Sequence, residues 1–266
     1  MSLRFSILAS GSTGNAMVVD NGEVRLLIDA GLSARKIETL LEQMDMSCAQ
    51  LDAVLVTHEH ADHIQGLGAL ARRYQLPVYA NKPTWEAMES KVGELKPEQR
   101  KMFRTGETLD FGLLQVQSYE VSHDAAEPVG FSFMQGDTKV CLMTDMGYVS
   151  PNVKKAVKEA DVLILECNHD TEMLRAGRYP WNVKRRILGD LGHLSNELAA
   201  EALVDLVTEK LRKVYLAHLS RDHNMLELAR MTVHQRLQES GVKWSHVELK
   251  DTYFDRPTLW DDLNER

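Results

Sequence analysis

Thr57-His58-Glu59-His60-Ala61-Asp62-His63 is the stretch that decides the fold, because four side chains able to bind a metal lie within six residues. The apolar, β-branched residues 51–56 before it predict a short buried strand. Residues 64–74 after it predict a helix with an apolar side. The cluster therefore lies on the loop that leaves the C-terminal end of a strand, where open α/β sheets usually bind ligands.

The residue types in this stretch suit a divalent metal. Neutral imidazoles and carboxylates are ligands for zinc, manganese or iron. His58 and His60 are two residues apart, so on an extended segment both can point toward one ion, and Asp62 and His63 could serve a second. A lone His-x-His is more often a chance pair on the surface. Four ligand types in this order at a strand-to-helix turn make metal binding the favoured interpretation.

Length and composition set the class of protein. A chain of 266 residues can bury a large core, and its 44% hydrophobic and 26% charged residues are typical of a globular domain. No apolar run approaches the roughly 20 residues of a membrane span, and the first residues lead into a strand instead of a signal peptide. Three cysteines (Cys48, Cys141 and Cys167) suggest a reducing compartment. We expect one cytoplasmic domain over residues 1–266, without membrane contact and with the oligomeric state left open.

The charge is acidic overall but contains one basic segment. A net charge of -8 argues against a general nucleic-acid coat protein, although a nuclease needs only one suitable face. Basic residues interleaved with aromatic residues suit phosphate contact and base stacking. The alternative, a solvated helix face with two core aromatic residues, is favoured on these residues alone. The segment 174–187 contains Arg175, Arg178, Tyr179, Trp181, Lys184, Arg185 and Arg186, and no acidic residue.

Strands and helices alternate along the chain, which indicates an α/β protein. We expect helices over 33–44, 64–74, 153–159, 196–210 and 225–239, and a polar connecting region with helical character over 82–101. Asp29 follows one strand and either orients the histidine loop or is an ordinary turn residue. We expect strands over 4–9, 16–20, 24–29, 51–56, 77–80, 113–121, 130–134, 140–143, 162–165, 214–217 and near 247. Five strand ends deliver polar side chains, which are His58, His123, Asp145, Glu166 and His218.

The pattern His-x-His-x-Asp-His resembles the signature of the metallo-β-lactamase fold hydrolases. The resemblance implies an αββα sandwich of two mixed β-sheets flanked by helices, with a two-metal site at one edge. His60 stands where the diiron oxygen-reducing branch has Glu, which argues against a redox role. The resemblance implies one metal held by His58, His60 and His123, a second held by Asp62, His63 and His218, and Asp145 as the bridging carboxylate.

Two metals about 3.5–4 Å apart can share a water, lower its pKa and make it the nucleophile. A phosphodiester suits this arrangement, although lactams, thioesters and lactones can use the same core. Glu166 and His193, with the sequences around them, resemble the phosphodiesterase branch that includes the tRNA 3′-end endonucleases. That resemblance implies that His193 protonates the departing oxygen, that Glu166 orients it and that Asp62 is catalytic as well as a ligand. The alternative for His193 is a helix cap.

Motifs spread over residues 10–224 carry a closer resemblance to the YycJ (WalJ)-like group of bacterial metallo-hydrolases. They include Ser10-Gly-Ser-Thr-Gly-Asn15, Thr144-Asp-Met-Gly-Tyr148, Glu166-Cys-Asn-His-Asp170 and Gly192-His-Leu-Ser-Asn196. The group implies a manganese- or zinc-dependent nuclease with 5′→3′ DNA exonuclease activity. The flexible arm of the tRNA processors and the β-CASP domain of larger nucleases have no counterpart here. The candidate substrate-binding residues are Ser195, Asn196, Ser220, Asn224, Arg185 and Arg186, with turn formation or helix capping as the equal alternative for the first four.

Two other classes of function stay open from the sequence. The first is a small-molecule hydrolase acting on an ester, a thioester or a cyclic phosphodiester, which would not need the basic segment. The second is a non-catalytic, metal-bound scaffold protein, against which the complete ligand set argues. His169 and His223 are candidates for residues around the ligands, whereas His234 and His246 are expected to be ordinary.

Overall fold

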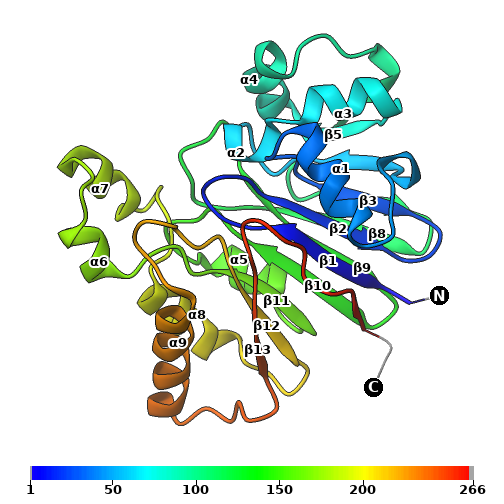
Figure 1. Ribbon diagram of the computed structural model, residues 1–266. Coiled ribbons are helices and arrows are strands. Elements are labelled where there is room, and N and C mark those ends of the chain that lie inside the picture. Colours follow the sequence, from blue (N-terminus) through cyan, green and yellow to red (C-terminus); the bar gives the residue numbers. More distant parts are fainter. Residues whose placement is uncertain (1, 264–266) are drawn as a thin grey trace.

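The computed structural model describes residues 2–263 and confirms the predicted sandwich of two mixed β-sheets (Figure 1). Each sheet has seven strands in the described residues, antiparallel on one side and parallel on the other. The first sheet has the order β14 (Asp261–Asp262), β1 (Arg4–Ala9), β2 (Ala16–Asp20), β3 (Arg25–Ile28), β4 (Ala53–Leu55), β5 (Val78–Asn81) and β6 (Arg100–Phe103). The second has the order β13 (Glu248–Asp251), β12 (Lys213–Ala217), β11 (Val162–Glu166), β10 (Thr138–Met143), β9 (Val129–Gln135), β8 (Leu114–Glu120) and β7 (Thr108–Phe111).

Helices cover the outer face of each sheet (Figure 1). The central layer between the sheets is apolar and aromatic, with Phe5, Phe131 and Phe133 among its buried residues. Both sheets contribute to that layer, which supports the expected single domain. The first sheet carries α1 (Ala34–Glu42), α2 (Ala61–Ile64), α3 (Leu67–Tyr74) and α4 (Lys82–Val92), with the 3₁₀ turns Cys48–Gln50 and Pro97–Gln99. The second carries α5 (Pro151–Val157), α6 (Thr171–Ala176), α7 (Trp181–Ile187), α8 (Asn196–Leu206) and α9 (Leu226–Ser240).

The expected helix over 64–74 is wrong in one respect, because the chain breaks between α2 and α3 at Gly66. The Gly66 N–H donates to the carbonyl of Ala30 at 2.8 Å. A Cβ at Gly66 would lie 2.3 Å from the Leu32 carbonyl oxygen, so the break lets two loops approach closely. The strands β6 and β7 were not expected either. Both are short edge strands whose side chains are largely exposed, so neither shows an apolar run.

None of the helices between residues 2 and 263 has the length and apolar character needed to span a bilayer.

The buried Asp20 at the end of β2 provides a test of the fold that is independent of the metal centre. Its Oδ2 accepts hydrogen bonds from Arg4 at 2.7 Å and from Arg25 at 3.1 Å, and its Oδ1 accepts the Gly22 N–H at 2.7 Å. Burial alone would raise the pKa of Asp20, but these donors hold the pKa below its ordinary value.

We expect Asp20→Asn to lower the free energy of unfolding by about 1–3 kcal/mol at pH 7, because charge-assisted hydrogen bonds are lost. A depressed folded-state pKa gives stability that is present above the unfolded pKa of about 3.9 and is lost as the pH falls through the folded value. Urea unfolding between pH 7 and pH 3 measures this difference, with the exposed Asp110→Asn as the control. A difference from wild type that stayed constant over this range would contradict the prediction.

Candidate metal centre

The polar strand ends meet at one edge of the sandwich. His58 lies on the loop after β4, His123 follows β8, and Glu166 ends β11. Two further positions, Asp145 after β10 and His218 after β12, have left-handed backbone conformations with φ of 59° and 56°. Such values are uncommon for residues other than glycine, and this strain is typical of functional sites.

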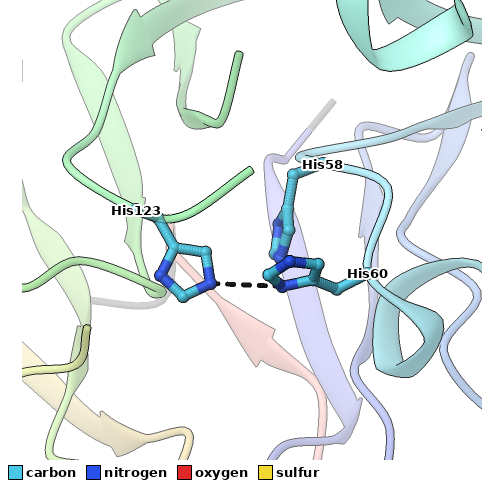
Figure 2. A group of neighbouring side chains, drawn as sticks. All are labelled: His58, His60 and His123. Carbon is cyan, nitrogen blue, oxygen red and sulfur yellow. Dashed lines mark hydrogen bonds between the residues drawn. The ribbon is translucent and has the colours of Figure 1, made fainter. Parts of the chain in front are cut away.

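His58, His60 and His123 form the first ligand group, with one ring nitrogen of each within 4.8 Å of the others (Figure 2). His123 Nδ1 donates to the Gly192 carbonyl at 3.0 Å, and His60 Nε2 donates to the Asp124 carbonyl at 3.2 Å. These bonds leave His123 Nε2 and His60 Nδ1 as acceptors that face each other at 3.3 Å. Two facing lone pairs are satisfied by a cation between them.

Asp62, His63 and His218 form a second group with the same mutual spacing. Nε2 of His63 and Nε2 of His218 lie 3.6 Å and 3.7 Å from Asp62 Oδ2. Asp145 lies between the groups, since its Oδ2 is 3.4 Å from His63 Nε2 of the second group and its Oδ1 is 3.9 Å from His123 Nε2 of the first. Asp145 also falls within 4.8 Å of the His58 ligand atom, as a bridging carboxylate would.

Three buried atoms of these groups support metal binding. His58 Nε2, His218 Nε2 and Asp145 Oδ2 have no hydrogen-bond partner among residues 2–263. A buried polar atom without a partner costs free energy, and a native fold retains few of them. Imidazole nitrogens and carboxylate oxygens are the donor set of borderline divalent metals. The residues therefore fit the divalent ions that the sequence predicts.

In the protein without metal, protonated histidines balance the negative charge of the buried carboxylates in the centre. Burial would raise the pKa of Asp145, but His218 and His63 hold it well below its ordinary value. Burial would lower the pKa of His218, but Asp145, Asp62 and Glu166 raise it to about 10. Burial lowers the pKa of His58 well below its ordinary value, so His58 stays neutral. A divalent ion competes with the protons on His218 and His63.

Asp29 orients the histidine loop, which is the first of the two roles considered for it. His63 Nδ1 donates to Asp29 Oδ2 at 2.7 Å. The Thr57 N–H donates to Oδ1 at 2.8 Å, and the Thr57 hydroxyl donates to Oδ2 at 2.9 Å. The same hydroxyl lies 3.0 Å from His58 Nδ1. One carboxylate thus fixes the imidazoles of both ligand groups.

Glu166 and His193 form the expected pair. Glu166 Oε1 accepts from His193 Nδ1 at 2.7 Å and from His218 Nδ1 at 2.9 Å, and its Oε2 accepts the Met146 N–H at 2.9 Å. Burial alone would raise the pKa of Glu166, but His193 and His218 lower it to about 2. The His193 side chain is 19% exposed, and its Nε2 is left available to a ligand. Glu166 therefore connects the buried ligand His218 by hydrogen bonds to the partly exposed His193.

Comparisons with known proteins agree with this geometry. A family profile described as "Beta-lactamase superfamily domain" matches residues 24–219. Exodeoxyribonuclease YycJ of Bacillus anthracis is 51% identical over 97% of this chain and 98% of its own length. The chain belongs to the metallo-β-lactamase superfamily, in its YycJ/WalJ group.

Two further comparisons support the metallo-β-lactamase assignment. Exodeoxyribonuclease WalJ of Streptococcus pneumoniae serotype 2 (strain D39) is 46% identical over 90% of this chain and 90% of its own length. The metallo-β-lactamase fold protein YhfI from Bacillus subtilis superposes with a TM-score of 0.73 over 97% of this chain and 99% of that chain. At 17% sequence identity, the likeness to YhfI shows the fold alone.

Four candidate substrate residues of this metallo-β-lactamase site have structural hydrogen bonds. The Ser195 hydroxyl accepts the Leu198 N–H at 3.2 Å as the N-cap of α8. The buried Asn196 and Asn224 side chains donate to each other at 3.0 Å and 2.9 Å, and the Asn224 amide also donates to the Cys167 carbonyl. The Ser220 hydroxyl accepts the His223 N–H at 3.2 Å. These contacts favour the alternative given for all four, which is capping and turn formation.

Histidines elsewhere in the chain lie outside the ligand groups found among the described residues. His169 is buried beside Asn168, with 3.4 Å between Nδ1 and Oδ1. The rings of His223 and His234 pack against Tyr179 and Trp244, and His246 Nε2 lies 3.0 Å from the Thr208 carbonyl.

The turn at residues 10–15, for which no role in the site was predicted, lies against the second ligand group. Asn15 Nδ2 is 3.1 Å from His63 Nε2, and the Ser10 hydroxyl accepts the His218 N–H at 2.8 Å. A Cβ at Gly31, on the loop after β3, would lie 1.6 Å from the Asp62 carbonyl oxygen and 2.6 Å from the Asn15 nitrogen, so glycine there lets the turn and the histidine loop approach each other. Gly11, Gly14 and Gly31 indicate in the sequence that the backbone is closely approached here, but they do not indicate which loop approaches it.

The basic segment forms α6, α7 and their connection, which project from the side of the sandwich (Figure 1). Trp181 is 63% exposed and Tyr179 is 37% exposed, so the alternative of two core aromatic residues is wrong. Lys184 is buried and donates to the Arg175 carbonyl at 2.6 Å, which gives it a structural role. Arg185 is exposed on α7.

Arg186 reaches the rim of the metal centre. Its guanidinium pairs with the carboxylate of Asp124, whose Oδ1 lies 3.5 Å from His123 Nε2. The basic segment and the first ligand group are therefore contiguous.

Proposed function

We propose that this metallo-β-lactamase fold nuclease is a 5′→3′ DNA exonuclease that uses two divalent ions, zinc or manganese. The observation that supports it best is the junction at Glu166, which holds a metal ligand, His218, and a partly exposed proton donor, His193, on one carboxylate. The relatives named as exodeoxyribonucleases match nearly their whole length. An exposed basic and aromatic segment beside the site suits a polyanion.

The chain's own residues perform the proton transfer. When bound, the divalent ions would supply Lewis acidity to the phosphodiester and lower the pKa of the attacking water. Glu166 accepts a hydrogen bond from His193 Nδ1–H, which fixes the tautomer and stabilises the imidazolium. His193 Nε2 then gives its proton to the departing oxygen as the phosphorus–oxygen bond breaks. Asp62 and Asp145 would hold the ions, and both are ionised at neutral pH because neighbouring imidazoles lower their pKa against the effect of burial.

End-labelled substrates test the proposal directly. Single- and double-stranded DNA and RNA are incubated with manganese or zinc, and wild type is compared with Asp62→Ala and His193→Ala. We expect wild type to shorten DNA from its 5′ end, and each variant to be strongly impaired. Metal analysis of the purified protein should give two ions per chain. Intact nucleic acid together with hydrolysis of thioesters or lactones would overturn the proposal in favour of a small-molecule enzyme.

The two other classes of function are less favoured. A small-molecule hydrolase does not account for the basic segment, whose Arg186 pairs with Asp124 at the rim of the metal centre. A scaffold protein does not need the buried Glu166, whose pKa is lowered to about 2, hydrogen-bonded to the partly exposed His193 and to the ligand His218.

We keep the cytoplasm as the proposed location and one domain over residues 1–266 as the proposed organisation. Cys48, Cys141 and Cys167 are all free and buried, which suits a reducing compartment.

Neutralising the basic segment should weaken DNA binding. We expect the double variant Arg185→Ala/Arg186→Ala to raise KM for DNA about tenfold or more. The slope of log Kd against log salt should fall by about 1–2, because binding releases fewer counterions when phosphate contacts are lost. Turnover of bis(p-nitrophenyl) phosphate should be unchanged.

The matched control is Arg236→Ala, an exposed arginine ten residues beyond the start of α9 and so about 15 Å along that helix. An unaltered salt slope in the double variant would remove the basic segment from the DNA path.

A further inference from the structure

We propose that Arg221 and Phe254, with the exposed hydroxyls of Ser12 and Thr13, form a second nucleotide-binding surface beside the metal centre, here called the Phe254 wall. It would hold the DNA strand next to the scissile phosphate by stacking and phosphate contact. The inference rests on the proposed function for its substrate class, but it concerns residues outside the basic segment and outside the ligand set.

Three segments far apart in the sequence meet at the Phe254 wall. The Ser10 N–H donates to the Tyr253 carbonyl at 2.8 Å. A Cβ at Gly11 would lie 3.1 Å from the Leu219 carbonyl oxygen and 3.8 Å from Phe254 Cβ. The turn at residues 10–15, the loop after β12 and the segment after β13 are therefore in contact.

The wall is adjacent to the second ligand group. Arg221 is three residues after His218, which limits the distance between their backbones to about 10 Å. Asn15, in the same turn as Ser12 and Thr13, lies 3.1 Å from His63 Nε2. A phosphodiester at the ligands would therefore place its neighbouring nucleotide within reach of this surface.

The chemistry of the wall suits a nucleotide. The Arg221 guanidinium carbon lies 4.2 Å from the centre of the Phe254 ring, and the Phe254 side chain is 40% exposed. No carboxylate among residues 2–263 pairs with Arg221, so its charge is available. A guanidinium on an aromatic face can contact a phosphate while the ring stacks on a base. The nearby Lys36 ammonium adds positive charge where it donates to the Asp255 carbonyl at 3.1 Å.

The loop after β12 connects the wall to the basic segment. Arg221 faces Phe254, whereas the next residue, Asp222, accepts a hydrogen bond from the Tyr179 hydroxyl at 2.8 Å. The loop that carries the ligand His218 thus contacts the C-terminal segment through Arg221 and the α6–α7 connection through Asp222. A DNA strand that crosses the metal centre would have an exposed aromatic residue on either side of this loop, Phe254 and Tyr179.

Binding and turnover together test the Phe254 wall. Anisotropy of a fluorescein-labelled 20-nucleotide single strand is measured on the metal-loaded protein in a His193→Ala background, which slows cleavage. We expect Phe254→Ala and Arg221→Ala each to raise Kd about tenfold, and Arg221→Ala to lower the salt slope by about 0.7. Phe254→Trp should retain binding, because it keeps the stacking surface, and Arg236→Ala is the charge control.

In the otherwise wild-type protein, Phe254→Ala and Arg221→Ala should raise KM for DNA with kcat nearly constant, and should leave hydrolysis of bis(p-nitrophenyl) phosphate unchanged. An unchanged Kd in both variants would overturn the inference, and so would a loss of diester hydrolysis, which would indicate a structural role. An equal loss of binding to an acidic peptide would overturn it in favour of a protein partner. If wild type binds DNA through Phe254 but does not cut it, the proposed exonuclease function fails and the wall stands.

Discussion

Replacing His193 by alanine is expected to lower kcat for DNA cleavage by about 10²- to 10⁴-fold while the metal ions stay bound. His193 Nδ1 donates to Glu166, and the side chain is partly exposed, so removing it opens no cavity in the core. The lost group is the proton donor to the departing oxygen, which makes the loss one of kcat. Single-turnover kinetics with metal analysis of the same samples measures both parts of this expectation.

A substrate with a good leaving group separates proton donation from other roles of His193. In the p-nitrophenyl ester of thymidine 5′-phosphate, the leaving group is p-nitrophenolate, which departs without protonation. Hydrolysis of this ester should therefore fall far less in His193→Ala than DNA cleavage does. Glu166→Gln should show the same pattern more weakly, because a neutral amide still accepts a hydrogen bond from Nδ1. Equal losses on both substrates would show that His193 is not the acid.

Asp145→Asn should reduce the metal content below two ions per chain and lower activity by at least about 10³-fold. Asp145 lies close to ligand atoms of both groups, since its Oδ2 is 3.4 Å from His63 Nε2 of the second group and its Oδ1 is 3.9 Å from His123 Nε2 of the first. The amide keeps the shape but removes the negative charge that two cations require. Metal analysis and calorimetric titration with manganese measure the expected loss of one site.

Thermal unfolding gives an independent measure of the same change. Metal that binds only the folded protein raises the stability of wild type, so the rise in Tm on adding manganese should be smaller in Asp145→Asn. Asp190→Asn, an exposed carboxylate on a nearby loop, is the matched control and should behave as wild type. Two tightly bound ions in Asp145→Asn would contradict the bridging role.

Much of the site could be predicted because one physical rule places it. Parallel strands end at the same edge of a sheet, so polar residues that follow buried strands are brought together. His123, Asp145 and His218 follow β8, β10 and β12, and all three reach the histidine loop. The starts of α1 and α8 follow an equally local rule, since the Ser33 and Ser195 hydroxyls each accept a backbone N–H three residues later.

Other features depend on tertiary contacts that a local pattern does not encode. Asn196 and Asn224 are 28 residues apart, and only the folded chain shows that each satisfies the other. Trp181 looked like a core residue because an aromatic residue on a short helix gives no sign of which side is covered. The contact of Arg221 with Phe254 joins two loops, which no periodicity predicts.

The pairing of β14 with β1 has a consequence for biosynthesis. Phe5 and Asp261 are partners, although they are 256 positions apart (261 − 5), and Asp261 also accepts hydrogen bonds from Lys213 and Tyr215 of the other sheet. At about 5–20 residues per second, a ribosome adds these positions roughly 10–50 s apart. During that time the outer edge of β1 lacks its neighbour and is open to pairing with other nascent chains, so chaperone protection matters most before residue 261 emerges.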